Sequence, residues 1–137
     1  MPMAGSSDKM EDKKTKVVGQ WVLDKQPTSK AMYQDLVDER VDGKKFDVNA
    51  LVQQVSEGSL DFNFAEDGTF TADEWMNKTR SKYKGDWVLK GSKLRVNQKF
   101  KGDVEEEDLM VGSVEGDKLK LIHEDMGLQI PLHFKRR

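Results

Sequence analysis

The sequence predicts a mainly β domain: an eight-stranded antiparallel meander barrel with a two-helix insertion between strands 1 and 2. Three observations support this prediction. From Ser59 almost to the end of the chain, apolar and polar residues alternate with a period of two. Short turns containing Gly or Asp separate the alternating segments, and short connections require antiparallel neighbours. Between Pro27 and Gly58, apolar residues instead recur at the three-and-four spacing of helices.

Length and composition fit one domain. The chain has 137 residues, and a domain of that length buries enough surface to fold without a disulfide or metal. It contains no cysteine, which excludes disulfides, thiolate zinc sites and a cysteine nucleophile. Residues 1–16 are polar, small and charged, so we expect a disordered leader there and the barrel domain over residues 17–137. The leader fits a cytoplasmic tail and equally an extracytoplasmic tether whose upstream signal was removed, so the compartment stays open.

The charge pattern argues against two kinds of partner. The chain has 23 basic and 25 acidic residues, interleaved along most segments, for a net charge of −2. A nucleic-acid-binding domain usually concentrates basic residues on one face, so no nucleic-acid partner is predicted. The longest apolar run is only a few residues, which predicts no membrane span. We expect a monomer without cofactor or metal.

The first strand and the two helices follow from local patterns. Residues 17–24 form a strand with Trp21 on its inner face, and we expect Pro27 to end it. Thr28 or Ser29 would then cap a first helix that closes at Gly43. The second helix should begin at Asp47, end near Gly58 and bury a stripe formed by Val48, Leu51, Val52 and Val55. We expect both helices to cover one mouth of the barrel as a lid.

Seven strands should follow the helices, with one buried face between them. A sheet with one buried face can close as a barrel or fold into a sandwich, and the continuous meander favours the barrel because closure removes both edges. Pro131 lies inside the last strand, where it cannot donate a ladder hydrogen bond, so we expect a bulge or a gap there. The predicted inward residues include Phe62, Phe64, Phe70, Tyr83, Trp87, Phe100, Ser113, His123 and Phe134.

The two ends of the barrel sequence carry a family resemblance. Gly19-Gln20-Trp21 opens the first strand, Asp67-Gly68-Thr69-Phe70 forms a turn, and Lys135-Arg136-Arg137 ends the last strand. Over roughly residues 17–137 this pattern resembles the lipocalin-like (calycin superfamily) β-barrel proteins. The resemblance implies that Arg136 packs over Trp21 at the closed end of the barrel. It also implies that the barrel binds a small apolar molecule in its interior.

Two features depart from the typical members of that superfamily. The pair of helices is similar to the lid of fatty-acid-binding proteins, but those proteins hold a carboxylate with an inward Arg-x-Tyr pair on the last strand. Here the last strand presents Leu132, Phe134 and Arg136 inward, so the pair is missing. The long C-terminal helix of typical lipocalins is absent from the sequence as well.

Two functions remain open at this point. In the first, a small hydrophobic ligand lies in the barrel against Phe62, Phe64, Tyr83, Trp87, Phe100 and His123. An eight-stranded barrel is just wide enough to hold one small ligand or to be filled by side chains. The alternative is therefore a filled barrel that acts as a protein-interaction module without ligand or catalytic activity. Trp75, on the outward phase of its strand, should pack under the helices or contact such a partner.

The sequence gives little support to an enzyme, and we predict none. His123 and His133 fall on opposite faces of their strands. Ser113 and His123 could both face inward and Glu74 could join them, but no spacing requires the three to meet. The acidic run from Glu105 to Asp108 lacks the residue order of a calcium loop. We therefore expect neither catalytic residues nor a metal site.

Overall fold

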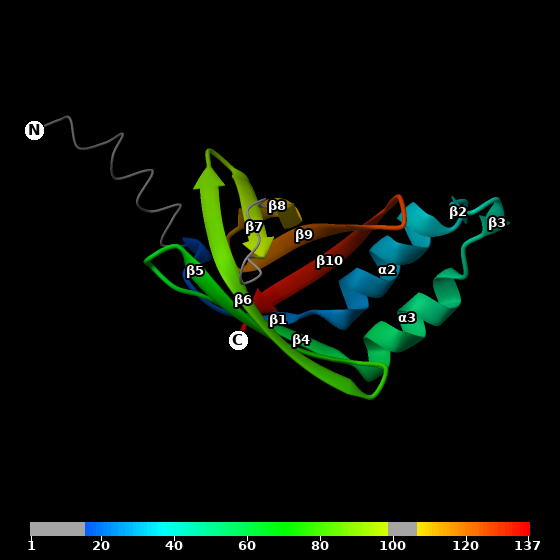
Figure 1. Ribbon diagram of the computed structural model, residues 1–137, viewed down its shortest axis with the longest axis horizontal. Helices are drawn as coiled ribbons and strands as arrows, with labels where there is room; N and C mark the ends of the chain where they lie inside the picture. The colour runs from blue at the N-terminus through cyan, green and yellow to red at the C-terminus, as the bar shows by residue number, and fades with distance from the viewer. Residues whose placement is uncertain (1–15, 99–106) are drawn as a thin grey trace, which may run out of the picture.

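A closed barrel of eight antiparallel strands dominates the computed structural model, which describes residues 16–98 and 107–137 (Figure 1). Outside these ranges lie residues 1–15 of the predicted leader and the predicted inward residue Phe100. Around the barrel the strand order is β1-β10-β9-β8-β7-β6-β5-β4, a meander that the first strand closes. The prediction of an eight-stranded meander barrel is therefore confirmed. The strands are β1 (Gly19–Leu23), β4 (Ser59–Phe64), β5 (Thr69–Met76), β6 (Thr79–Lys90), β7 (Lys93–Gln98), β8 (Glu107–Glu115), β9 (Lys118–Asp125) and β10 (Leu128–Arg136).

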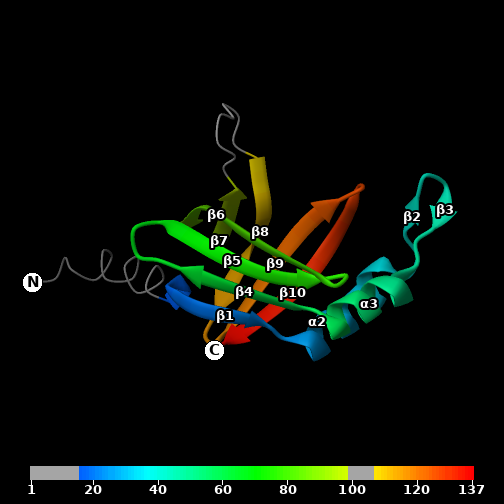
Figure 2. The same cartoon turned by 60° about the horizontal axis from the view of Figure 1, so that its bottom comes forward.

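Strand β1 closes the barrel by pairing with β4 on one side and β10 on the other. Trp21 lies opposite Phe62 of β4 and Arg136 of β10. The Trp21 side chain is fully buried, as its inward phase predicted. The two helices lie together at the end of the barrel where β1 ends and β4 begins (Figures 1 and 2).

The first helix differs from its predicted bounds at both ends. Helix α2 spans Lys25–Leu36, so it begins before Pro27 instead of after it. Proline is tolerated in a first turn because the amides there have no intrahelical acceptor. Beyond α2, a small hairpin joins β2 (Arg40–Val41) to β3 (Lys44–Lys45). Gly43 lies in the turn of this hairpin, with φ of 79°, and does not close the helix.

The second helix has the predicted bounds. Helix α3 spans Val48–Glu57, and the Asp47 side chain accepts a hydrogen bond of 3.1 Å from the amide of Ala50. The amide of Gly58 donates to the Val55 carbonyl at the other end. The apolar stripe faces the barrel, with Val48 and Val55 buried. Within the described ranges, no helix has the length and apolarity needed to cross a membrane.

Of the bulge or gap expected at Pro131, the structure has the gap and not the bulge. Strand β10 pairs with β9 in continuous register through Pro131 and Ile122. The backbone of His133 points its N–H and C=O toward Thr28 and Asp24, away from β9. Pro131, two residues earlier, points the same way, where β1 has already ended. Its missing N–H therefore falls in a gap of the ladder and costs no hydrogen bond.

Strand β8 has the opposite phase from the predicted one. Gly112 pairs with Leu121 and Ser113 pairs with Lys120, so Ser113 lies on the outer face and is exposed. Met110 is buried in its place. Residues 109–111 are three consecutive apolar residues, Leu, Met and Val. The alternation of apolar and polar residues therefore could not determine which of them face inward. A register irregularity between Val96 and Asn97 of β7 adds to the difficulty.

Candidate ligand-binding site

Trp21 and Arg136 form a stacked pair close to the end of the barrel opposite the helices. The Arg136 guanidinium carbon lies 4.1 Å from the centroid of the Trp21 ring. The indole N–H donates to the Val17 carbonyl at 2.8 Å. The guanidinium donates to the carbonyls of Val18, at 2.7 Å, and Lys16. The pair implied by the family resemblance is confirmed, and its donors are directed at backbone carbonyls.

Aromatic rings fill the part of the barrel next to this pair. Phe62 stacks on Phe64 with 5.4 Å between ring centroids and meets Phe134 edge-on at the same distance. Trp87 contacts Phe64 edge-on at 6.0 Å, and its indole N–H donates to the Ala65 carbonyl. These rings are buried, as predicted. These ring contacts make this part of the interior a packed aromatic core.

A cavity of about 340 Å³ lies between the two helices and the barrel. Met32 of α2 and Leu51 and Val55 of α3 line it on the helical side. Barrel side chains that include Leu60, Met110, Ile130 and Leu132 line the opposite side. This cavity, with its mainly apolar lining beneath the helices, is the candidate site.

A few polar side chains face the same cavity. Glu74, Tyr83 and His123 come from three barrel strands, and Gln54 and Asp125 lie at its edge. Burial, followed by the negative charge of Glu74 and a hydrogen bond with it, raises the pKa of Tyr83 well above its ordinary value. Tyr83 is therefore neutral at any physiological pH, and its hydroxyl can donate to the neighbouring Glu74 carboxylate.

Two of the six predicted ligand-binding residues line the cavity. Tyr83 and His123 do so, while Phe62, Phe64 and Trp87 belong to the packed rings and do not line it. Phe100 lies outside the described residues. Sequence reasoning missed Gln54 and Asp125. Gln54 could have been predicted, because it follows Leu51 by three residues and so lies on the same face of α3 as the apolar stripe.

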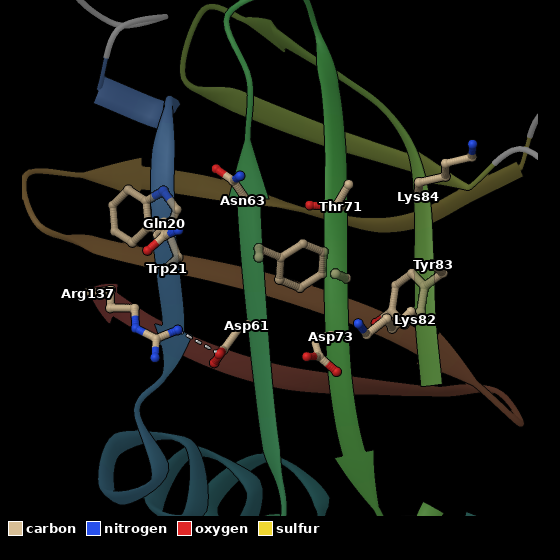
Figure 3. Close-up of a pocket in the computed structure, with 12 residues that line it drawn as sticks. Gln20, Trp21, Asp61, Asn63, Thr71, Asp73, Lys82, Tyr83, Lys84 and Arg137 are labelled. Atoms are coloured by element: carbon tan, nitrogen blue, oxygen red, sulfur yellow. Dashed lines mark hydrogen bonds and ion pairs between the residues drawn. The ribbon is translucent and has the colours of Figure 1, made fainter. Parts of the chain in front are cut away.

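A larger hollow with a mixed lining lies in the barrel wall. About 590 Å³ of space lies at β1, β4, β5 and β6, and Figure 3 shows the residues around it. Charged and polar side chains of the outer face line it together with the inward residues Trp21, Phe62, Ala72 and Tyr83. Asp61 and Arg137 form an ion pair across it at 3.0 Å. Nearby, Arg80 binds both oxygens of Asp73. Exposed pairs of this kind are worth about 0–1 kcal/mol, so we interpret this surface as a solvated sheet face.

Trp75 does not pack under the helices. Its side chain is 43% exposed, beside the end of α3. It lines a groove of about 260 Å³ together with Gln54, Glu57, Asn77 and Lys78. The expectation of burial is wrong here because the outer face of β5 is not covered by the helices at this point.

The catalytic arrangement weighed from the sequence does not form. Ser113 lies on the outer face of β8, whereas His123 lines the interior cavity. Among residues 16–98 and 107–137, no group of three or more His, Asp or Glu side chains is placed to hold a metal ion.

Together the closed meander, the Trp21–Arg136 pair and the interior cavity define a lipocalin-like barrel. No family model matches the sequence, and no curated protein matches it significantly. Among solved structures, the chain is similar to a mutant of the fatty acid transporter REP1-NXSQ, with a TM-score of 0.48, 9% identity and coverage of 88% of this chain and 98% of that one. It is also similar to As-p18, an extracellular fatty acid binding protein, with a TM-score of 0.47, 13% identity and coverage of 89% and 96%.

Proposed function

We propose that the barrel binds a small apolar molecule in the cavity beneath α2 and α3, as a carrier or sensor. The observation that carries the proposal is the cavity of about 340 Å³, roofed by helices and lined mainly by apolar side chains. Ligand pockets begin at about 300 Å³ and combine an apolar lining with a few polar groups that fix orientation. The polar side chains Glu74, Tyr83 and His123 fit that second requirement.

The size of the cavity sets the expected affinity. A ligand that loses about 300 Å² of apolar surface gains about 7.5 kcal/mol at about 25 cal/mol per Å². Loss of translational and rotational freedom offsets part of this gain. We therefore expect dissociation constants in the micromolar range or weaker.

The alternative function is a protein-interaction module, and one observation favours it. Trp75 is 43% exposed on a groove beside α3, and tryptophan is enriched where proteins bind one another. The packed rings fill only part of the barrel interior, however, and the cavity under the helices remains unfilled by side chains. Ligand binding is therefore the function that the geometry supports best.

A pair of tryptophan substitutions on α3 tests the proposal. Leu51→Trp places a larger side chain in the cavity lining, and Gln53→Trp adds the same ring at an exposed position on the same helix. We expect Leu51→Trp to weaken binding of an apolar fluorescent probe at least about tenfold, and Gln53→Trp to leave it unchanged. Native mass spectrometry of the purified protein should also detect a co-purified small molecule. Equal probe binding by both variants would contradict the proposal.

A further inference from the structure

Acidic side chains outnumber basic ones in the described lining of the interior cavity. Among the described residues that line it, Glu74 and Asp125 are acidic, His123 is the one basic side chain, and no Lys or Arg is present. Lys82 and Lys84 flank Tyr83 in the sequence, but they lie on the outer face of β6 and line the larger hollow there. The described lining therefore offers negatively charged hydrogen-bond acceptors, but no Lys or Arg to balance an incoming anion.

Glu74 is the acidic group best placed to meet the head of a ligand. It lies on the inward phase of β5, partly buried, in the same cavity as the apolar side chains Leu60 and Met76. The Tyr83 hydroxyl neighbours its carboxylate and can donate to it. A carboxylate accepts up to about four hydrogen bonds, so it can still accept others from a ligand.

A carboxylate head group and an ammonium head group should differ strongly in their free energy of binding to this cavity. A ligand carboxylate would lose hydration next to Glu74 and Asp125 without gaining a Lys or Arg partner in the described lining. Such an anion would also compete with the neighbouring Glu74 carboxylate for the Tyr83 proton. An ammonium head would instead form charge-assisted hydrogen bonds, which are about twice as strong as neutral ones.

We propose that the cavity prefers an apolar molecule with a primary ammonium head to one with a carboxylate head, and that Glu74 receives that head. This inference rests on the proposed function, because it concerns the ligand of the same cavity. It names the ligand class as amphiphilic amines with a short hydrocarbon tail.

Three probes with the same tail test the preference: decylamine, decanol and decanoate. We expect wild-type protein to bind decylamine at least about tenfold more tightly than decanoate, a difference of about 1.4 kcal/mol, with decanol between them. Isothermal titration calorimetry at about pH 8 keeps the amine protonated and the acid ionised. Decanoate binding as tightly as decylamine would overturn this inference while leaving the proposed function intact. Absence of binding by all three probes would overturn both.

A matched pair of variants tests the role of Glu74. Glu74→Gln should lower decylamine affinity to that of decanol and leave decanol affinity unchanged. Glu124→Gln removes the same charge from the exposed outer face of β9, between His123 and Asp125, and should keep the preference for the amine. A preference that persists in Glu74→Gln would overturn the assignment to Glu74. The wild-type order of the three probes decides the head-group preference even if Glu74→Gln fails to fold.

Discussion

Arg136 lies over the indole ring of Trp21, with 4.1 Å between the guanidinium carbon and the ring centroid. The two residues face each other across β1 and β10, the strands that close the barrel. Arg136 also donates to the carbonyls of Val18 and Lys16, which precede β1. The Arg136 side chain therefore holds the Trp21 ring and also the segment from Lys16 to Val18 that precedes β1. A cation over an indole face contributes about 0.5–2 kcal/mol.

Truncation of this pair should destabilise the barrel. We expect Trp21→Ala to lower the free energy of unfolding by about 3–5 kcal/mol, because it leaves a cavity in a packed region. Arg136→Lys keeps the charge but loses the planar fork, so we expect a smaller loss of about 1–2 kcal/mol. Urea denaturation measures both values. A Trp21→Ala variant that melts within a degree or two of the parent would contradict this role for Trp21.

The barrel could be predicted from the sequence because its signals are local. Period-two alternation and Gly- or Asp-containing turns located all eight barrel strands, and the capping pattern of Asp47 and Gly58 located α3. The start of α2 was missed because Pro27 acts as a breaker in most contexts but is tolerated in a first turn. The β2–β3 hairpin was missed because each strand has only two residues, too few to show a period.

The candidate site was only partly predictable. Alternation identified Tyr83 and His123 as inward, and both line the cavity. It also identified Phe62 and Phe64 as inward, but could not show that these rings stack on each other and fill their part of the barrel. The space left empty depends on the packing of many side chains, and periodicity carries no information on that packing.

Thr28 should be important for anchoring the first helix to the barrel. It is fully buried, and its hydroxyl donates to the His133 carbonyl at 3.2 Å and accepts from the His133 amide at 2.9 Å. Thr28→Val leaves that amide without its partner, which should cost about 1–3 kcal/mol. The carbonyl keeps its bond from the amide of Asp24, so the loss should not be larger.

Thr28→Ser is the matched control, because it keeps the hydroxyl and removes one methyl group. We expect it to cost about 0.8 kcal/mol or less, the value of one buried CH₂. Chemical denaturation of both variants measures the difference. A larger loss for Thr28→Ser than for Thr28→Val would show that the methyl group contributes more than the hydrogen bonds to fixing α2 on β10.

The stability of the protein should fall in mildly acidic solution because of His133. Burial, followed by the positive charge of Lys120, lowers the pKa of His133, although Asp24 and Asp35 oppose the shift. The unfolded chain therefore takes up a proton more readily than the folded one. The free energy of unfolding should decrease as pH falls below about 6.5 and stop decreasing below the folded-state pKa.

Two substitutions check this pH dependence by urea denaturation between neutral and mildly acidic pH. His133→Gln should remove the decrease, and Lys120→Gln should reduce it, because the neighbouring positive charge is lost. The pKa values of Asp67 and Asp73 are lowered by hydrogen bonds, so their effects appear only at more acidic pH. An unchanged pH profile in His133→Gln would assign the decrease to other groups.

The two helices over the cavity are held differently. Helix α2 is anchored at its first turn by Thr28 and its bonds to β10. Helix α3 is tied to α2 by exposed hydrogen bonds, from Lys25 to the Ser56 carbonyl and from the Tyr33 hydroxyl to Asn49 at 2.7 Å. Exposed bonds of this kind open at low cost in free energy. We therefore expect α3 to be the part of the lid that moves.

Hydrogen exchange measures this difference directly. Amides of α3, from Val48 to Glu57, should exchange faster than those of the barrel strands and of α2, because α3 can lift without breaking the strand ladder. Tyr33→Phe removes one tie between the helices and should speed exchange in α3 further. Decylamine, or decanol if the preference for amines fails, should slow exchange in α3, since a bound tail contacts Leu51 and Val55. Uniform protection of both helices, unchanged by any of the ten-carbon probes, would mean that α3 is a fixed part of the core. A carrier function for this cavity would then have no route of access through the helices.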